Sequence, residues 1–306
     1  MIKVRVPATS ANLGPGFDAF GIALNLFNDF IFREKRELRL PKGYGILGPG
    51  SLAENAFRLL AAEGGYAMPE ELEIGIRARV PRSRGLGSSA TLSVAGLAAA
   101  SAWFKAGLGE AELLELASRL EGHPDNAAPA IMGGFVISVS EGGKIHYLRT
   151  APPRPLKVVA AVPEFELKTA DSRRVLPEGV SFGDAVYNEA RTGLLAGALI
   201  CGRYELLRVA MTDRLHQPYR APLVKGLEAA LEAAMASGAL GVCLSGSGPT
   251  VLIFCPAEKN FAKGESQADK ISRAVSLVWQ EAGVKSRCYY LDVAKKGYLL
   301  SEEAEA

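Results

Sequence analysis

The sequence predicts an α+β protein built from two domains. The chain has 306 residues, which is more than a single hydrophobic core usually serves. Runs with strand-like alternation and runs with helical spacing are interspersed along it, so strands and helices are mixed. The strongest interruption is APPRP at residues 151–155, because prolines disfavour regular structure. We therefore expect an N-terminal domain over residues 1–150 and a C-terminal domain over residues 151–306.

Apolar periodicity predicts the individual elements. Ser51 is expected to cap the first helix, and the Gly64-Gly65 pair to end it. In the first half, strands are expected at 2–6, 22–32, 71–80, 133–140 and 145–150, and helices at 51–65, 90–106 and 109–122. In the second half, strands are expected at 156–163, 241–255 and 286–293, and helices at 181–202, 221–238 and 268–283.

The composition limits the classes of partner. The formal net charge is only +2, so there is no electrostatic reason to expect nucleic acid or an anionic membrane as a partner. The longest stretch of small apolar residues, 90–104, is too short to span a bilayer. The first residues alternate like a strand and lack the apolar region of a signal peptide. We expect a cytoplasmic enzyme, with the oligomeric state left open and a homodimer among the alternatives.

The stretch PRSRGLGSSA at residues 81–90 predicts a phosphate-binding loop. A strand is expected before it and a helix after it, so backbone N–H groups and the positive end of a helix would face an anion. A polar turn that only caps the helix is the plain alternative. The loop does not match the Walker pattern. A second glycine-rich stretch, GPGFDA at 14–19, fits a dinucleotide fingerprint in letters but is followed by a predicted strand rather than a helix.

Three stretches together resemble the motifs of a known family. VPATSANLGPGFDAFGIAL at 6–24, PRSRGLGSSAT at 81–91 and GVCLSGSGPTVLIF at 241–254 are similar to the first, second and third motifs of the GHMP kinases. Within that family, the first motif and EGHPDNAAPAIMGGF at 121–135 are most similar to the homoserine kinases. The resemblance implies an S5-like βαβ N-terminal domain and a ferredoxin-like C-terminal domain, with the site between them. It also implies transfer of the ATP γ-phosphoryl group to the side-chain hydroxyl of L-homoserine.

The resemblance also implies which residues bind ATP and Mg²⁺. Ser89 is expected to face the metal, which needs only one or two protein oxygen ligands. Glu115 is expected as the other ligand, with Glu121 as the alternative; a surface pair of Glu115 with Arg119 is the plain interpretation. The residues expected to contact the nucleotide are Asn55 on the first helix and Pro81, Arg82, Arg84, Gly85, Leu86, Gly87, Ser88 and Ser89 in the loop.

A further set of residues is expected to bind the amino-acid substrate. By the same resemblance, Asp18 would take the ammonium group, and Asn12 and Asn126 would position the reacting hydroxyl. The substrate carboxylate needs a cation, for which arginine offers a bidentate fork. Arg191 and Arg220 are the expected cations, and the general base stays undecided. His123 and Gly246 complete the expected substrate-binding set, and Asp125 is expected to brace the loop.

Two other functions remain open from the sequence. Another small-molecule GHMP kinase, such as one acting on mevalonate, would share the phosphate loop but not the need for an ammonium partner. A GHMP-fold ligand sensor without catalysis would not need to retain Mg²⁺ ligands. Candidate groups stand at every required position, which favours the kinase.

Overall fold

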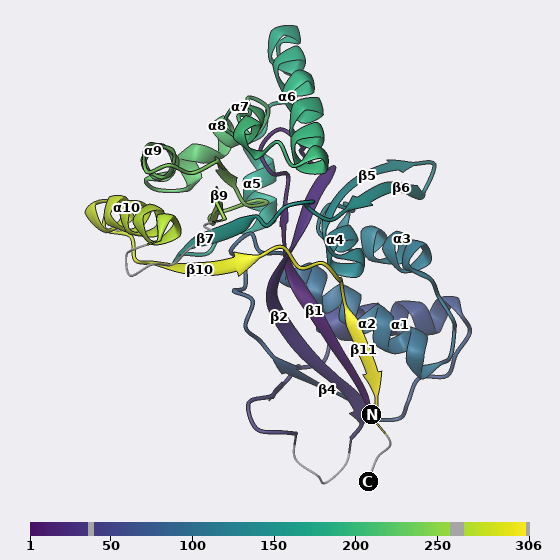
Figure 1. The fold of residues 1–306 in the computed structure, drawn as a ribbon. Coiled ribbons are helices and arrows are strands. Elements are labelled where there is room, and N and C mark those ends of the chain that lie inside the picture. The colour runs from purple at the N-terminus through teal and green to yellow at the C-terminus, as the bar shows by residue number, and fades with distance from the viewer. Residues whose placement is uncertain (36–39, 258–265, 304–306) are drawn as a thin grey trace.

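A computed structural model describes residues 1–35, 40–257 and 266–303 of the chain. Two antiparallel sheets lie one above the other, and each is covered by helices (Figure 1). The first sheet is formed mainly by the first half of the sequence and the second sheet by the second half.

In the described residues the first sheet has seven strands, built around a long central hairpin of β1 and β2. β2 is long enough to pair with β4 along one part and with β5 along another. The strand that follows residues 14–19 rules out a dinucleotide-binding turn there, as predicted. The strands are β1 (Ile2–Ala11), β2 (Phe20–Glu34), β3 (Gly45–Ile46), β4 (Leu72–Arg77), β5 (Phe135–Glu141), β6 (Lys144–Thr150) and β11 (Leu299–Glu302).

Helices cover one face of this sheet (Figure 1). The predicted cap is confirmed, because the Ser51 hydroxyl accepts the N–H of Glu54 at 3.3 Å. The second helix is buried between the sheet and the first, and its small residues allow this. A Cβ on Gly96 would lie 2.1 Å from the carbonyl oxygen of Ala53. The helices are α1 (Leu52–Glu63), α2 (Ser88–Trp103), α3 (Glu110–Glu121) and α4 (Ala127–Met132).

The second sheet has four strands in the described residues, in the spatial order β10, β7, β9, β8. Numbered along the chain, this is 4-1-3-2, with helices after the first and third strands, which is the ferredoxin-like arrangement. The stretch 241–255, which was expected to supply strand, forms two strands separated by the turn at 245–250. The strands are β7 (Lys157–Pro163), β8 (Gly241–Leu244), β9 (Val251–Cys255) and β10 (Ser286–Asp292).

Helices of the second half pack on both faces of this sheet. The helix expected over 221–238 begins only after Gly226, because Pro222 lies in a short 3₁₀ turn and Gly226 has a left-handed φ of 76°. The long α6 projects from the body (Figure 1). The helices are α5 (Thr169–Arg174), α6 (Phe182–Cys201), α7 (Leu207–Ala210), α8 (Gln217–Arg220), α9 (Leu227–Ala236) and α10 (Gln267–Glu281), with 3₁₀ turns at Tyr204–Leu206 and Ala221–Leu223.

The two sheets are joined by a common apolar cluster and by the C-terminal strand, which pairs with the first sheet. One buried apolar cluster contains Ile22 of β2 together with Val158 of β7 and Leu195 of α6. The chain then returns to the first sheet, because β11 pairs with β1 with Ile2 opposite Glu302. The strand β11 was not expected from the sequence. The division of the chain at residues 150 and 151 stays a prediction.

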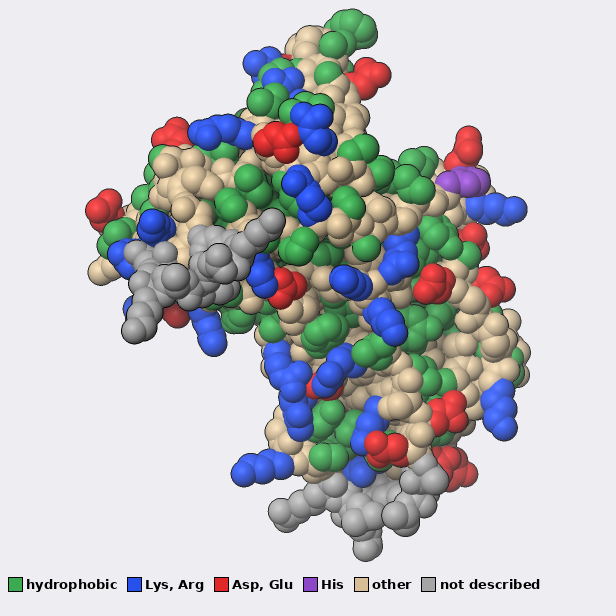
Figure 2. All heavy atoms as spheres, viewed as in Figure 1, with side chains coloured by type: hydrophobic (Ala, Val, Ile, Leu, Met, Phe, Trp, Pro, Cys, Tyr) green, Lys and Arg blue, Asp and Glu red, His purple; other side chains and the backbone are tan. Residues whose placement is uncertain are grey.

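The surface carries both signs of charge. Lys and Arg side chains are interspersed with Asp and Glu over the face shown in Figure 2, in keeping with the small net charge. Among the described residues, no helix has the length and apolar character that crossing a membrane requires.

Candidate active site

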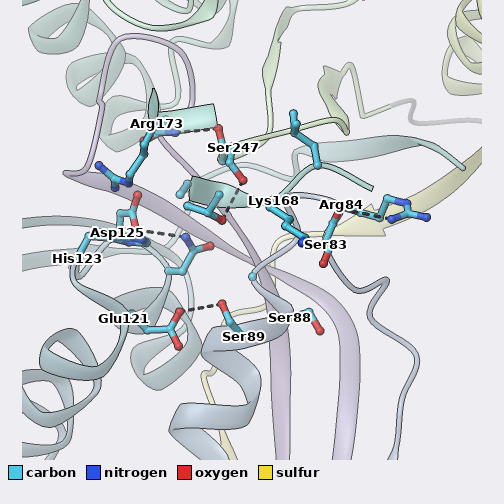
Figure 3. A pocket seen from close by; sticks show the side chains of 18 of the residues that line it. Ser83, Arg84, Ser88, Ser89, Glu121, His123, Asp125, Lys168, Arg173 and Ser247 are labelled. Atoms are coloured by element: carbon cyan, nitrogen blue, oxygen red, sulfur yellow. Dashed lines mark hydrogen bonds and ion pairs between the residues drawn. The ribbon is translucent and has the colours of Figure 1, made fainter. Parts of the chain in front are cut away.

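A cavity of about 420 Å³ lies where the two halves of the chain meet. The phosphate loop, the connection from α3 to α4, α5 and the turn after β8 each contribute side chains to it (Figure 3). Twelve of the predicted site residues line this cavity: Asn12, Asp18, Arg82, Arg84, Gly85, Gly87, Ser88, Ser89, His123, Asn126, Arg220 and Gly246.

The phosphate loop ends at Gly87, a position that has room only for glycine. Gly87 caps α2 with a left-handed φ of 62°. A Cβ there would lie 1.9 Å from Thr9 Oγ1 and 2.9 Å from Asn126 Oδ1, so the backbone passes close to both side chains. The first N–H groups of α2 have no partner within the helix, and they lie at the positive end of its dipole. These N–H groups are free to donate hydrogen bonds to an anion in the cavity.

Arg84 lines the cavity and also fastens the loop to the second half of the chain. Its guanidinium donates to the carbonyls of Pro163 at 3.1 Å and Glu164 at 2.9 Å, just after β7. The N–H of Leu167 donates in turn to the carbonyl of Ser83 at 3.2 Å. These bonds fasten the loop to the segment that leads into α5 and bring Lys168 to the wall of the cavity (Figure 3).

Ser89 and Glu121 meet at the start of α2. The Ser89 hydroxyl donates to Glu121 Oε2 at 2.7 Å (Figure 3). Ser93 donates to Oε1 of the same carboxylate at 2.5 Å. Glu115 lies elsewhere, in a second cavity beside Arg119 and Glu63. The reason is helical geometry, because six residues along α3 correspond to about 600° of rotation and the two glutamates face different sides. The structure therefore brings Glu121, the alternative named from the sequence, to Ser89, and leaves Glu115 away from it.

The turn between α3 and α4 presents a chain of polar contacts. Thr9 Oγ1 donates to Asn126 Oδ1 at 2.7 Å, and Asn126 Nδ2 donates to Asp125 Oδ1 at 3.2 Å. His123 Nδ1 lies 2.5 Å from the same Asp125 oxygen. The bond to Asp125 raises the pKa of the His123 imidazole, while burial acts against this shift. Asp125, which is 2% exposed, braces the turn as expected.

Asp18 lies beside this turn, with a carboxylate oxygen within 4.8 Å of ligand atoms of His123 and Asp125. Asn12 and Asp18 both adopt left-handed φ values, of 69° and 55°, and the Asp18 N–H donates to Asn12 Oδ1 at 3.0 Å. Asn12 Nδ2 donates to the carbonyl of Gly246 at 3.0 Å. Arg173 of α5 donates to both Asp18 carboxylate oxygens, at 2.9 and 2.6 Å, and this hydrogen-bonded pair raises the pKa of Arg173.

Arg220 is a buried cation behind this pair. Its side chain is 1% exposed, and burial lowers the pKa of its guanidinium to about 10. Nε donates to the carbonyl of Ser172 at 3.1 Å, and Nη1 donates to the carbonyl of Gly246 at 3.1 Å. The guanidinium carbons of Arg173 and Arg220 lie 5.4 and 5.2 Å from the ring of Phe17.

Four other predicted residues do not line this cavity. Arg191 lies on α6 over the ring of Tyr187 and donates to Thr212 Oγ1 at 2.7 Å, whereas Arg173, which was not expected, lines the cavity. Asn55 is exposed on α1 and donates to the carbonyl of Gly50 at 3.2 Å. Leu86 is buried in the core shared by the two sheets, and Pro81, the first residue of the loop, does not line the cavity.

Two sets of side chains could hold a metal ion. The Ser89 and Glu121 pair offers oxygen atoms only, which suits Mg²⁺. Asp18, His123 and Asp125 also bring ligand atoms within 4.8 Å of one another. In that cluster Asp18 is already paired with Arg173, and Asp125 with His123. The first set therefore fits Mg²⁺ better.

Comparison with protein families decides the classification. The N-terminal domain of GHMP kinases matches residues 51–134, and the C-terminal domain of GHMP kinases matches residues 194–281. The chain belongs to the GHMP kinase family. The first match includes the phosphate loop and the Asn126 turn, and the second includes Arg220 and the Gly246 turn.

Curated members of the GHMP kinase family align over nearly the whole chain. A homoserine kinase of Halothermothrix orenii is 38% identical, covering 98% of this chain and 96% of the relative. A homoserine kinase of Carboxydothermus hydrogenoformans is 40% identical, covering 97% and 96%. The crystal structure of homoserine kinase from Cytophaga hutchinsonii has a TM-score of 0.83 and 27% identity, covering 98% and 97%. A mevalonate kinase structure from Methanococcus jannaschii, with a TM-score of 0.67 and 14% identity, covers 96% and 98% and shares the two-domain fold.

Proposed function

We propose that this chain is a kinase that transfers the γ-phosphoryl group of ATP to the side-chain hydroxyl of L-homoserine, giving O-phospho-L-homoserine. One observation carries the proposal. A single cavity is lined both by the glycine-rich loop and by Asp18, Arg173 and Arg220, a carboxylate and two guanidinium groups that suit a zwitterion. Relatives 38–40% identical over most of the chain carry the name homoserine kinase.

The phosphate end of the cavity receives the nucleotide. The N–H groups of Gly87, Ser88 and Ser89 and the α2 dipole bind the β- and γ-phosphates. Lys168, which also lines the cavity, adds a cation. Ser89 and Glu121 hold Mg²⁺, which supplies neutralising charge to the transferring phosphoryl group when bound.

The opposite end receives the amino acid. The Asp18 carboxylate binds the ammonium group, and Arg173 and Arg220 bind the carboxylate, so each charged group of a zwitterion has a partner. The side chain of the substrate then extends toward Asn126, which lies next to Gly87 of the loop. Asn12 and Asn126 orient the hydroxyl.

The chemistry follows from this placement. Phosphoryl transfer passes through a loose transition state, so positioning and charge stabilisation contribute more than covalent help. The amides of Asn12 and Asn126 are fixed by Gly246 and Thr9, which limits the freedom of the reacting hydroxyl. The cytoplasmic location expected from the sequence stays a prediction, and so does a homodimer.

A substrate panel tests the proposal. Purified protein with ATP and Mg²⁺ is offered homoserine, mevalonate and galactose, and ADP release and the phosphorylated product are measured. We expect the highest kcat/KM with homoserine, because mevalonate has a carboxylate but no ammonium group for Asp18. A preference for mevalonate would overturn the substrate and leave the kinase in place. Nucleotide binding without transfer to any of the three would favour a ligand sensor.

A further inference from the structure

A buried histidine lies directly behind Arg220. His216 precedes α8 and is 1% exposed. Its Nε2 lies 2.7 Å from the carbonyl oxygen of Gly14, and its Nδ1 lies 3.3 Å from Arg220 Nη1. The ring of Phe17 stands 5.2 Å from the imidazole. His216 thus joins the turn that carries Asp18 to the guanidinium of Arg220.

The two partners admit only one form of the ring. A carbonyl oxygen can only accept, so Nε2 must carry a proton toward Gly14. A guanidinium can only donate, so Nδ1 must present a lone pair toward Arg220. The neutral tautomer with the proton on Nε2 satisfies both contacts, whereas the imidazolium would set two donors against each other. Burial lowers the pKa of His216, which favours the neutral ring.

The charged groups around the ring are few and of both signs. Asp213 Oδ2 lies 3.6 Å from Nε2, and Asp18 also acts on the ring from the neighbouring turn. Asp213 is largely committed to the backbone, because it accepts the N–H groups of Leu215, His216 and Gln217. The cation facing the ring is Arg220 itself.

These contacts determine what Arg220 can offer to a ligand. Three of its five N–H donors are taken, by Ser172 O, Gly246 O and His216 Nδ1. Within the described residues, Nη2 has no hydrogen-bond partner. Because the other two nitrogens are held from behind, the Nη2 edge of the guanidinium is the edge left for the cavity that Arg220 lines.

We propose that neutral His216 is the positioning residue for Arg220, holding the guanidinium so that its Nη2 edge meets the carboxylate of the substrate. The proposal rests on the proposed function, in which Arg220 binds that carboxylate. His216 touches neither substrate nor nucleotide. Its effect is therefore on the binding of the amino acid and not on the binding of ATP.

Two substitutions of His216 test the contacts of its two ring nitrogens separately. His216→Asn places an amide oxygen near the position of Nδ1 and keeps an acceptor for Arg220. His216→Gln places an amide nitrogen near the position of Nε2 and keeps a donor for Gly14. We expect His216→Gln to raise the homoserine KM by about tenfold or more, the effect of losing a hydrogen bond to a charged group. The ATP KM and kcat should stay within about twofold of the wild type.

The matched variant should behave in the opposite way. His216→Asn should keep the homoserine KM within about twofold of the wild type and lower the melting temperature, because the Gly14 carbonyl loses its donor. In the Arg220→Leu background, His216→Gln should have no further effect on the homoserine KM. Equal effects of the two His216 variants, or a parallel rise in the ATP KM, would assign His216 a structural role only and overturn the proposal.

The tautomer can be observed without any activity. The chain has three histidines, so imidazole ¹⁵N resonances of the intact protein can be assigned with one variant per histidine. We expect His216 at pH 7 as the neutral ring with the proton on Nε2. An imidazolium, or a ring with the proton on Nδ1, would overturn the proposal. A wild-type protein with this tautomer but without homoserine activity would instead overturn the proposed function.

Discussion

Asp18 and Arg173 form a bidentate ion pair between positions 155 residues apart in the sequence, with contacts of 2.9 and 2.6 Å. Asp18 lies between β1 and β2 of the first sheet, and Arg173 lies on α5 after the second sheet has begun. An ammonium group that binds Asp18 competes with Arg173 for the same oxygens. A zwitterion resolves the competition, because its own carboxylate offers Arg173 a replacement partner.

The first prediction compares two arginines. Arg173→Leu should raise the homoserine KM by roughly thirtyfold or more, because a charged hydrogen-bonded contact with the carboxylate is lost. Arg191→Leu is the matched control, since its guanidinium lies over Tyr187 and outside the cavity. Steady-state kinetics with homoserine and ATP varied in turn measure both. A larger effect at Arg191 than at Arg173 would return the carboxylate to the residue first expected from the sequence.

The second prediction concerns the metal. Glu121→Gln should lower kcat by about a hundredfold or more, the scale on which the loss of a charge-stabilising group acts. The nearby Glu115→Gln should leave kcat close to the wild type, because Glu115 faces the second cavity. Activity is measured as the Mg²⁺ concentration is varied, and circular dichroism checks that both variants fold. Equal activity of the two variants would remove Glu121 from the metal site.

The conformation of the phosphate loop could be predicted from the sequence because it depends on local backbone geometry. Gly87 must adopt a left-handed φ and approach Thr9 closely, and a glycine between a strand and a helix signals this. The helix α2 then begins at Ser88, directly after this glycine. Such requirements depend on a few consecutive residues, so the loop can be predicted without knowing how distant parts of the chain pack.

Glu121 and Arg173 show where the sequence is insufficient. Glu115 and Glu121 belong to the same predicted helix, and only the packing of α3 against α2 decides which of them reaches Ser89. Arg173 lies in the charged run DSRRVL, which is typical of a solvent-facing helix. Its partner Asp18 becomes its neighbour only when both sheets are in place.

The third prediction tests the close approach at the phosphate loop. Gly87→Ala should weaken ATP binding and destabilise the protein, because the new Cβ would lie 1.9 Å from Thr9 Oγ1. Gly107→Ala is the control, since Gly107 also has a left-handed φ, of 68°, but no atom within 4 Å of a new Cβ. The control should lose only about 1–2 kcal/mol of unfolding free energy for the backbone conformation. Calorimetry with ATP and urea unfolding give both quantities; equal ATP affinities in the two variants would contradict a phosphate site at Gly87.

The fourth prediction concerns the pH dependence of stability that His123 confers. Its pKa is raised in the folded protein, chiefly by the hydrogen bond to Asp125, above the value of about 6.5 for an unfolded chain. The folded state therefore holds the proton more tightly than the unfolded state. The resulting stabilisation is complete below about pH 6.5 and is lost as the pH rises through the folded pKa.

Urea unfolding of the wild type and of His123→Gln, at pH values from below about 6.5 to above the folded pKa of His123, isolates the stabilisation that the protonated ring provides. The difference in unfolding free energy should be larger at the acid end and shrink as the pH rises. His216 acts with the opposite sign, because its pKa is lowered by burial, so only the difference between the two proteins is informative. In the Asp125→Asn background the pH-dependent part should disappear, since the partner that raises the pKa is gone. A difference that grows with pH would show that Asp125 does not stabilise the protonated ring.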